Sequence, residues 1–138
     1  MQALIVFNFN EELNNNKYFT TKIKFLLNNI PYYNIVCFNN NDNNRNVLLE
    51  NITENIDEKI RDCFIEDSDD FFTEINNVLS VRGVREIIIV GKGFMKTLKK
   101  LVKHDYTVNV EKRMLELNND ELFVLNELAS LNNNFKIF

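Results

Sequence analysis

Two short groups of polar residues follow apolar runs of the sequence, at places where an α/β protein can bind a ligand. Two asparagines follow the apolar run 3–7, and a Gly-Lys-Gly turn follows the apolar run 86–90. In open parallel sheets, ligands bind beyond the carboxyl ends of the strands. Backbone N–H groups at a turn before a helix are typical of phosphate and carboxylate sites. The candidate ligand-binding residues are therefore Asn8, Asn10, Gly91, Lys92, Gly93 and Lys96.

Each group also has an interpretation that involves no ligand. Asparagine is a turn-forming residue, and the chain contains 25 of them, so Asn8 and Asn10 are equally typical of an ordinary turn. The stretch GKGFMKT, residues 91–97, is not a phosphate-binding P-loop, because methionine rather than glycine precedes its Lys-Thr pair. A tight turn without a ligand therefore stays open as an alternative at 91–93.

A run of lysines follows this turn and is the second candidate for an interaction surface. In a helix over 94–104, Lys96, Lys99, Lys100 and Lys103 share one face. Such a face suits phosphate, nucleic acid or an acidic partner, and it is also typical of a plain solvated surface. The aromatic residues expected of a single-strand binder are absent from it.

The residue types needed for metal or nucleophilic chemistry are scarce. Cys37, Cys63 and His104 are too few and too unpatterned for a zinc site. The acidic run 66–70, EDSDD, can in principle hold Mg²⁺, but such a run is more typical of a helix start or a solvated turn. We expect no metal and no cofactor.

Length and composition indicate one globular domain over residues 1–138. Hydrophobic residues make up 45% of the chain, and the net charge is -4 at pH 7, which argues against bulk affinity for nucleic acid or membranes. No apolar run approaches the roughly 20 residues that span a bilayer, and no signal peptide is recognised at the start. A cytoplasmic protein is expected, and the abundance of asparagine is typical of an AT-rich genome.

The hydrophobic pattern predicts alternating strands and helices. Strands are expected over 3–7, 34–38, 86–90, 106–110 and 135–138, with short strands possible at 47–49 and 63–65. Helices are expected over 17–29, about 69–81, 94–104 and 119–131. This order predicts an α/β fold: a doubly wound, mostly parallel, Rossmann-like sheet of about five to six strands with helices on both faces. The expected core residues include Ile5, Val6, Ile35, Val36, Ile88, Ile89 and Val108.

Three short segments resemble the isochorismatase-like family of cysteine hydrolases, which includes nicotinamidases. Phe7-Asn8-Phe9-Asn10 lies where that family has a strand followed by Asp-x-Gln. Residues 82–91, RGVREIIIVG, are similar to the family's "rGi..liivG" segment, and residues 104–110, HDYTVNV, to its "Gy.V.vv" segment. The resemblance implies an isochorismatase-like α/β fold over most of the chain.

The catalytic residues of that family are not carried over. Asn8 stands where the family has its general base, and an amide does not accept a proton at neutral pH. The nucleophile position falls on Thr97 when counted from Gly91 and on Gly93 when counted back from Tyr106, so no cysteine is supplied. Lys59 does not fit the spacing of the family's lysine. The resemblance therefore implies a shortened relative with no catalytic residues.

Three hypotheses about function follow. The leading one is a non-catalytic isochorismatase-like protein that binds a protein partner or associates with itself. Its apolar C-terminal residues are Phe123, Leu125, Leu128 and Phe138. The second is binding of a small anionic ligand or nucleotide in the crevice near Asn8 and Gly93. The third is a hydrolase that uses other groups.

Overall fold

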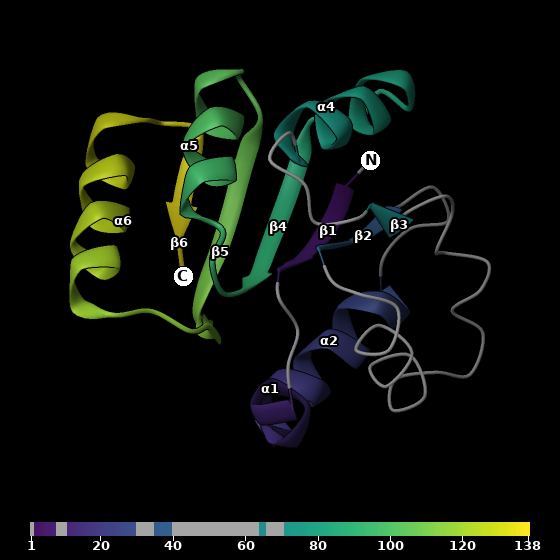
Figure 1. Ribbon diagram of the computed structural model, residues 1–138, viewed down its shortest axis with the longest axis vertical. Coiled ribbons are helices and arrows are strands. Elements are labelled where there is room, and N and C mark those ends of the chain that lie inside the picture. The colour runs from purple at the N-terminus through teal and green to yellow at the C-terminus, as the bar shows by residue number, and fades with distance from the viewer. Residues whose placement is uncertain (1, 8–10, 30–34, 40–63, 66–70) are drawn as a thin grey trace.

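Strands and helices alternate along the chain in the computed structural model (Figure 1). The structure describes residues 2–7, 11–29, 35–39, 64–65 and 71–138. Its strands are β1 (Gln2–Phe7), β2 (Ile35–Asn39), β3 (Phe64–Ile65), β4 (Glu86–Gly91), β5 (Thr107–Leu115) and β6 (Phe135–Ile137). Its helices are α1 (Glu11–Asn15), α2 (Lys17–Asn29), α4 (Phe71–Val81), α5 (Met95–Lys103) and α6 (Asn119–Leu131).

The strands form one parallel sheet in the order β3-β2-β1-β4-β5-β6, counted over the described residues. β1 pairs in parallel with β2 on one side and with β4 on the other, and β4 and β6 pair in parallel with β5. The predicted α/β class and the adjacency of strands β2, β1, β4 and β5 are therefore confirmed. The chain passes from β1 to β2 in one direction and from β4 to β5 in the other, so the topological switch point lies between β1 and β4.

One face of the sheet packs against α4, α5 and α6 and holds the main hydrophobic core. Every second residue of a strand points to this face, as Ile5, Ile89 and Val108 do, and each is fully buried. Phe7 at the end of β1 packs edge-on against Phe71 of α4, with ring centroids 5.3 Å apart. Each buried aromatic or aliphatic side chain of this kind contributes roughly 1.5–3 kcal/mol of transfer free energy.

The other face of the sheet is covered in part by α1 and α2. Phe19 and Ile23 of α2 are fully buried. Two contacts join α2 to β5: the Lys22 ammonium lies 3.5 Å from a Glu111 carboxylate oxygen, and the Arg113 guanidinium lies 3.6 Å from the centre of the Tyr18 ring. Because α4, α5 and α6 cover the opposite face, helices lie on both faces of the sheet.

Several predicted boundaries are corrected by the structure. α1 was not predicted; it is separated from α2 by Asn16, whose side-chain oxygen accepts a hydrogen bond of 3.1 Å from the Phe19 backbone N–H and so caps α2. α5 begins at Met95, later than predicted. β5 continues to Leu115, five residues beyond its predicted end. The prediction stopped early because residues 111–115 alternate less clearly between polar and apolar types. The short strand considered at 47–49 lies outside the described residues.

Candidate functional site

The carboxyl ends of β1 and β4 meet at the switch point through backbone contacts. The Lys92 N–H donates a hydrogen bond of 3.1 Å to the Phe7 carbonyl oxygen, and the Glu116 N–H donates one of 3.0 Å to the Gly91 carbonyl oxygen. Gly91 has a φ of +103°, and a Cβ there would collide with the Phe7 carbonyl oxygen. Only glycine fits this position, since both the backbone angle and the close approach exclude a side chain.

The carboxylate of Glu116 lies at this edge of the sheet, and the sequence analysis did not predict it. The Lys92 ammonium is 3.8 Å from Oε2 of Glu116, the residue that follows β5. Oε1 of the same carboxylate is buried and accepts no hydrogen bond in the described structure. Lys92 is thus engaged with a negative group, which lowers its availability to an anionic ligand.

The N-terminus of α5 lies two residues beyond Gly93. Its N-cap residue, Phe94, makes no side-chain hydrogen bond to the first turn, so that turn's N–H groups have no side-chain acceptor at that position. Lys96 is exposed, and Thr97, one of the two places considered for the family nucleophile, is buried. Asn8 and Asn10 lie outside the described residues. Of the six predicted ligand-binding residues, the structure describes Gly91, Lys92, Gly93 and Lys96, which lie between the end of β4 and the first turn of α5. Their role in binding stays a prediction.

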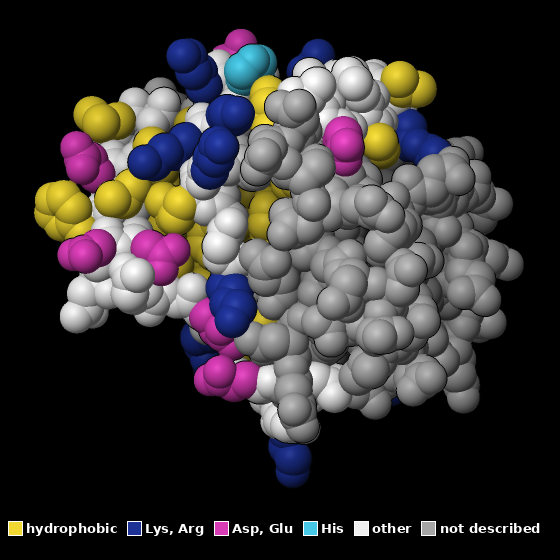
Figure 2. All heavy atoms as spheres, viewed as in Figure 1, with side chains coloured by type: hydrophobic (Ala, Val, Ile, Leu, Met, Phe, Trp, Pro, Cys, Tyr) yellow, Lys and Arg dark blue, Asp and Glu magenta, His cyan; other side chains and the backbone are white. Residues whose placement is uncertain are grey.

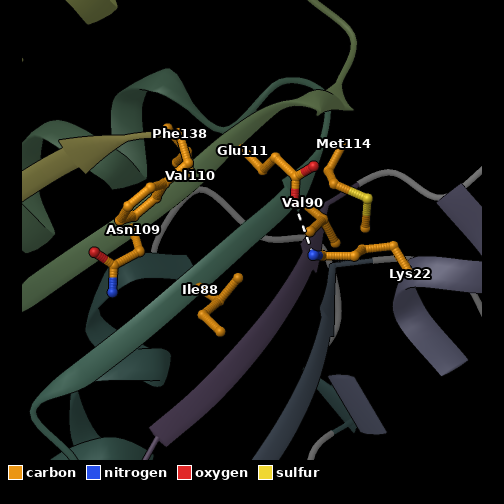
Figure 3. Close-up of a pocket in the computed structure, with 8 residues that line it drawn as sticks. All are labelled: Lys22, Ile88, Val90, Asn109, Val110, Glu111, Met114 and Phe138. Atoms are coloured by element: carbon orange, nitrogen blue, oxygen red, sulfur yellow. Dashed lines mark ion pairs between the residues drawn. The ribbon is translucent and has the colours of Figure 1, made fainter. Parts of the chain in front are cut away.

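A hollow lies away from the switch point, on the face of the sheet that carries α2 (Figure 3). This hollow, here called the sheet-face groove, has a volume of about 440 Å³. Figure 3 shows Lys22 and Met114 at one end and Asn109 and Phe138 at the other, with β4 side chains between them. The lining residues are Lys22, Ile88, Val90, Asn109, Val110, Glu111, Met114 and Phe138.

Along one row of the sheet, among the described residues, burial on this face decreases from β1 to β4 and β5. Leu4 of β1 stands in register with Ile88 of β4, which in turn stands in register with Asn109 of β5. Leu4 is fully buried, whereas Ile88 and Asn109 are only partly buried. Ile88 was predicted to be a core residue, and this is corrected: its side chain forms the floor of the groove. The predicted burial of Ile5, Val6, Ile89 and Val108 is confirmed, and the side chains at 35 and 36 lie outside what is described.

The groove is mostly apolar, with a few polar groups along it. The ion pair between Lys22 and Glu111 lies at one end. Near the other end, the Asn109 side-chain N–H donates a hydrogen bond of 3.4 Å to a Glu86 carboxylate oxygen. Apolar walls with a small number of polar groups are the usual make-up of binding sites.

Sequence reasoning missed this groove, although the sequence contains a signal for it. Residues 107–111, TVNVE, alternate between polar and apolar types. Strict alternation indicates a strand with one face that is not packed in a core. The equivalent stretches of β1 and β4 are continuous apolar runs, and so they gave no such signal.

The predicted apolar C-terminal residues do not behave alike. Leu125 is fully buried in the main core, and Leu128 is partly buried against it. Phe123 and Phe138 are each 70% exposed. Phe138 lines the sheet-face groove, whereas Phe123 lies on α6, which packs on the opposite face of the sheet.

None of the helices in the described part of the chain is both long enough and apolar enough to cross a bilayer. No three His, Cys, Asp or Glu side chains of the described residues gather as a metal site would require.

Over the described residues, the fold and the site define an α/β protein with a parallel sheet, a groove on one face of that sheet and a switch point at Gly91. Comparison of the chain with protein-family models, with curated proteins and with solved structures finds no match.

Proposed function

We propose that the protein acts by binding rather than by catalysis, and that it associates with a second copy of itself through the sheet-face groove. The observation that carries this proposal is the position of Phe138, a large aromatic side chain that is 70% exposed at the edge of an apolar hollow. Exposing such a side chain to water is unfavourable, and burying it in a partner contributes much of the energy of typical interfaces.

A projecting side chain beside a hollow is the arrangement that a two-fold contact uses. In such a contact the same surface patch of both subunits meets, so Phe138 of each copy enters the groove of the other. Ile88, which is only partly buried on the floor of the groove, provides apolar surface for the ring, and the buried side chains of Val90 and Met114 lie beside it. β6 supports the same contact, since it is the last strand of the described sheet and pairs with a neighbour on one side only.

The charges at the groove are compatible with self-pairing. A patch that meets itself must not carry a single sign of charge, because like charges would then face each other. Lys22 and Glu111 supply one charge of each sign, so a two-fold contact can place the lysine of one copy near the glutamate of the other.

Membership of the isochorismatase-like family is part of the same proposal. The all-parallel sheet with β1 and β4 at its centre supports it, together with the segments at 82–91 and 104–110. On this proposal the chain is a shortened relative of about six strands that has lost the hydrolase residues and keeps the scaffold for interaction.

The test is the molar mass in solution, measured by light scattering over a range of concentrations. We expect a monomer–dimer equilibrium for the unaltered chain and a monomer for Phe138→Ser. Phe123→Ser is the matched control, because Phe123 is equally exposed but lies on α6. A monomer at every concentration, or equal behaviour of the two variants, would contradict self-association.

A second candidate function is binding of a small anion at the switch point. The uncapped first turn of α5 and the exposed Lys96 favour it, and the carboxylate of Glu116 opposes it. Calorimetric titration with inorganic phosphate and with nucleotides tests it. Binding below millimolar that weakens about tenfold in Lys96→Glu supports this function, as expected for loss of a charge-assisted hydrogen bond. No binding at millimolar ligand removes it.

A further inference from the structure

Four lysines form a stripe along the solvent side of α5. Lys96, Lys99, Lys100 and Lys103 are all exposed. Figure 2 shows Lys and Arg side chains gathered over the position that α5 has in Figure 1. Because a helix rises about 1.5 Å per residue, the stripe is about 10 Å long. The four residues are called the lysine stripe below.

No carboxylate neutralises the lysine stripe within the described structure. The ion pairs found there involve Lys22 and Lys92 and none of the four. The Lys100 ammonium lies 5.7 Å from the centre of the Phe72 ring. Like charges three or four residues apart destabilise a helix slightly, and none of the four lysines forms an ion pair with a carboxylate of the described residues.

The apolar side of α5 is buried in the main hydrophobic core of the protein. Leu98 and Leu101 are completely buried, and Val102 is 5% exposed. A basic amphipathic helix on its own is typical of a membrane-surface or calmodulin-target segment. Here the helix has no apolar side left to offer such a partner, so only its charged side is available.

Acidic residues limit the width of the positive surface. Figure 2 shows Asp and Glu side chains beside the lysines, over the position of α6. The acidic residues of α6 are Asp120, Glu121 and Glu127. A nucleic-acid duplex or a lipid bilayer extends sideways over α6 and would bring its phosphates toward these carboxylates, which repel them. A partner only one peptide chain wide avoids that repulsion.

We propose that the lysine stripe binds an acidic segment of a partner protein, one that presents several carboxylates within about 10 Å, the length of the stripe. The partner meets a row of four lysines whose backbone positions are fixed by the helix and whose flexible side chains adapt to its carboxylates. This contact is independent of the sheet-face groove, because the stripe and the groove involve different elements and opposite faces of the sheet.

The experiment measures the fluorescence anisotropy of a labelled oligoglutamate peptide titrated with the full chain at low salt. The test variant is Lys99→Glu/Lys103→Glu. The control, Lys112→Glu/Lys136→Glu, changes the net charge equally at exposed lysines of β5 and β6. We expect binding to weaken about tenfold or more in the test variant, as for the loss of several exposed ion pairs, and by less than about twofold in the control. Circular dichroism of both variants verifies that they are folded.

Three outcomes would overturn the proposal. The first is equal weakening in the two variants, which would indicate a response to net charge alone. The second is absence of peptide binding to the unaltered chain at low salt. The third is tighter binding of an oligonucleotide or of phosphatidylserine vesicles than of the peptide, with the same dependence on Lys99 and Lys103. Binding that fades as the salt rises to about 1 M, where the Debye length is about 3 Å, is the expected companion result.

Discussion

Lys22 of α2 and Glu111 of β5 form an ion pair with 3.5 Å between the ammonium and a carboxylate oxygen, at one end of the sheet-face groove. The two side chains are 36% and 24% exposed, so water screens their attraction. The pair joins α2 to β5, and both of its residues line the groove. Because both side chains are partly exposed, the pair contributes little to holding the fold together.

Breaking this pair is expected to change stability little and association more. Lys22→Ala should lower the free energy of unfolding by less than about 1 kcal/mol, as is usual for partly exposed pairs. Lys22→Glu should weaken the proposed dimer, because two carboxylates then lie side by side in each groove. The exchanged variant Lys22→Glu/Glu111→Lys should restore it. Urea unfolding and sedimentation velocity measure the two effects, and a dimer indifferent to Lys22→Glu would count against the groove as the interface.

Gly91→Ala is expected to be strongly destabilising. The new Cβ would meet the carbonyl oxygen of Phe7, which lies in a fully buried residue of β1, and the φ of +103° would be strained as well. We expect a loss of about 2–4 kcal/mol in the free energy of unfolding. Gly83→Ala is the matched control. Gly83 has a φ of 69°, and a Cβ there would meet no nearby atom. Gly83→Ala should therefore lower the free energy of unfolding by only about 1 kcal/mol. Equal losses would show that the close approach of β1 and β4 is unimportant.

Tyr106 and Asn76 are expected to stabilise the fold as a coupled pair. The buried Tyr106 hydroxyl donates a hydrogen bond of 2.6 Å to the Asn76 side-chain oxygen, which joins the start of β5 to α4. Tyr106→Phe keeps the ring and removes this bond, so we expect a loss of about 1–2 kcal/mol. Asn76→Ala leaves the hydroxyl only the longer contact of 3.5 Å with the Ser80 hydroxyl and should cost a similar amount or slightly less. The double variant should cost clearly less than the sum, and simple additivity in urea unfolding would contradict the coupling.

Purified protein is expected not to hydrolyse nicotinamide or isochorismate above a control without protein. The sequence has asparagine at position 8 in place of the family's general base, and no cysteine at either candidate position in the α5 region. Turnover that survives purification and disappears in Asn8→Ala would contradict the proposed loss of catalysis.

The sequence predicted the layout of the fold well where apolar runs were long. The runs at 3–7 and 86–90 predicted β1 and β4 within one residue of their observed ends, because a continuous apolar run is typical of a central strand of a parallel sheet. α1 was missed because five residues rich in asparagine carry little helical signal. The break at Asn16 depends on a capping hydrogen bond that a pattern of hydrophobicity does not contain.

The candidate site was less predictable than the fold. The turn at Gly91–Gly93 could be located, since it follows a strand and precedes a helix. The nearness of Glu116 could not, because it depends on β5 running beyond β4 and on the register shift between Ile89 and Gly91. The groove depends on where α2 stops covering the sheet, and this is a property of tertiary packing rather than of any local segment.

The central claim, that two copies meet through Phe138 and the sheet-face groove, is tested most directly by isotope-filtered nuclear Overhauser spectroscopy. The sample is an equal mixture of chains with labelled Ile and Met methyl groups and chains with labelled Phe rings. We predict contacts between the Phe138 ring of one copy and the methyl groups of Ile88 and Met114 of the other, and their loss in Phe138→Ser. A sample that is dimeric by sedimentation but shows no such contacts between copies would contradict the account.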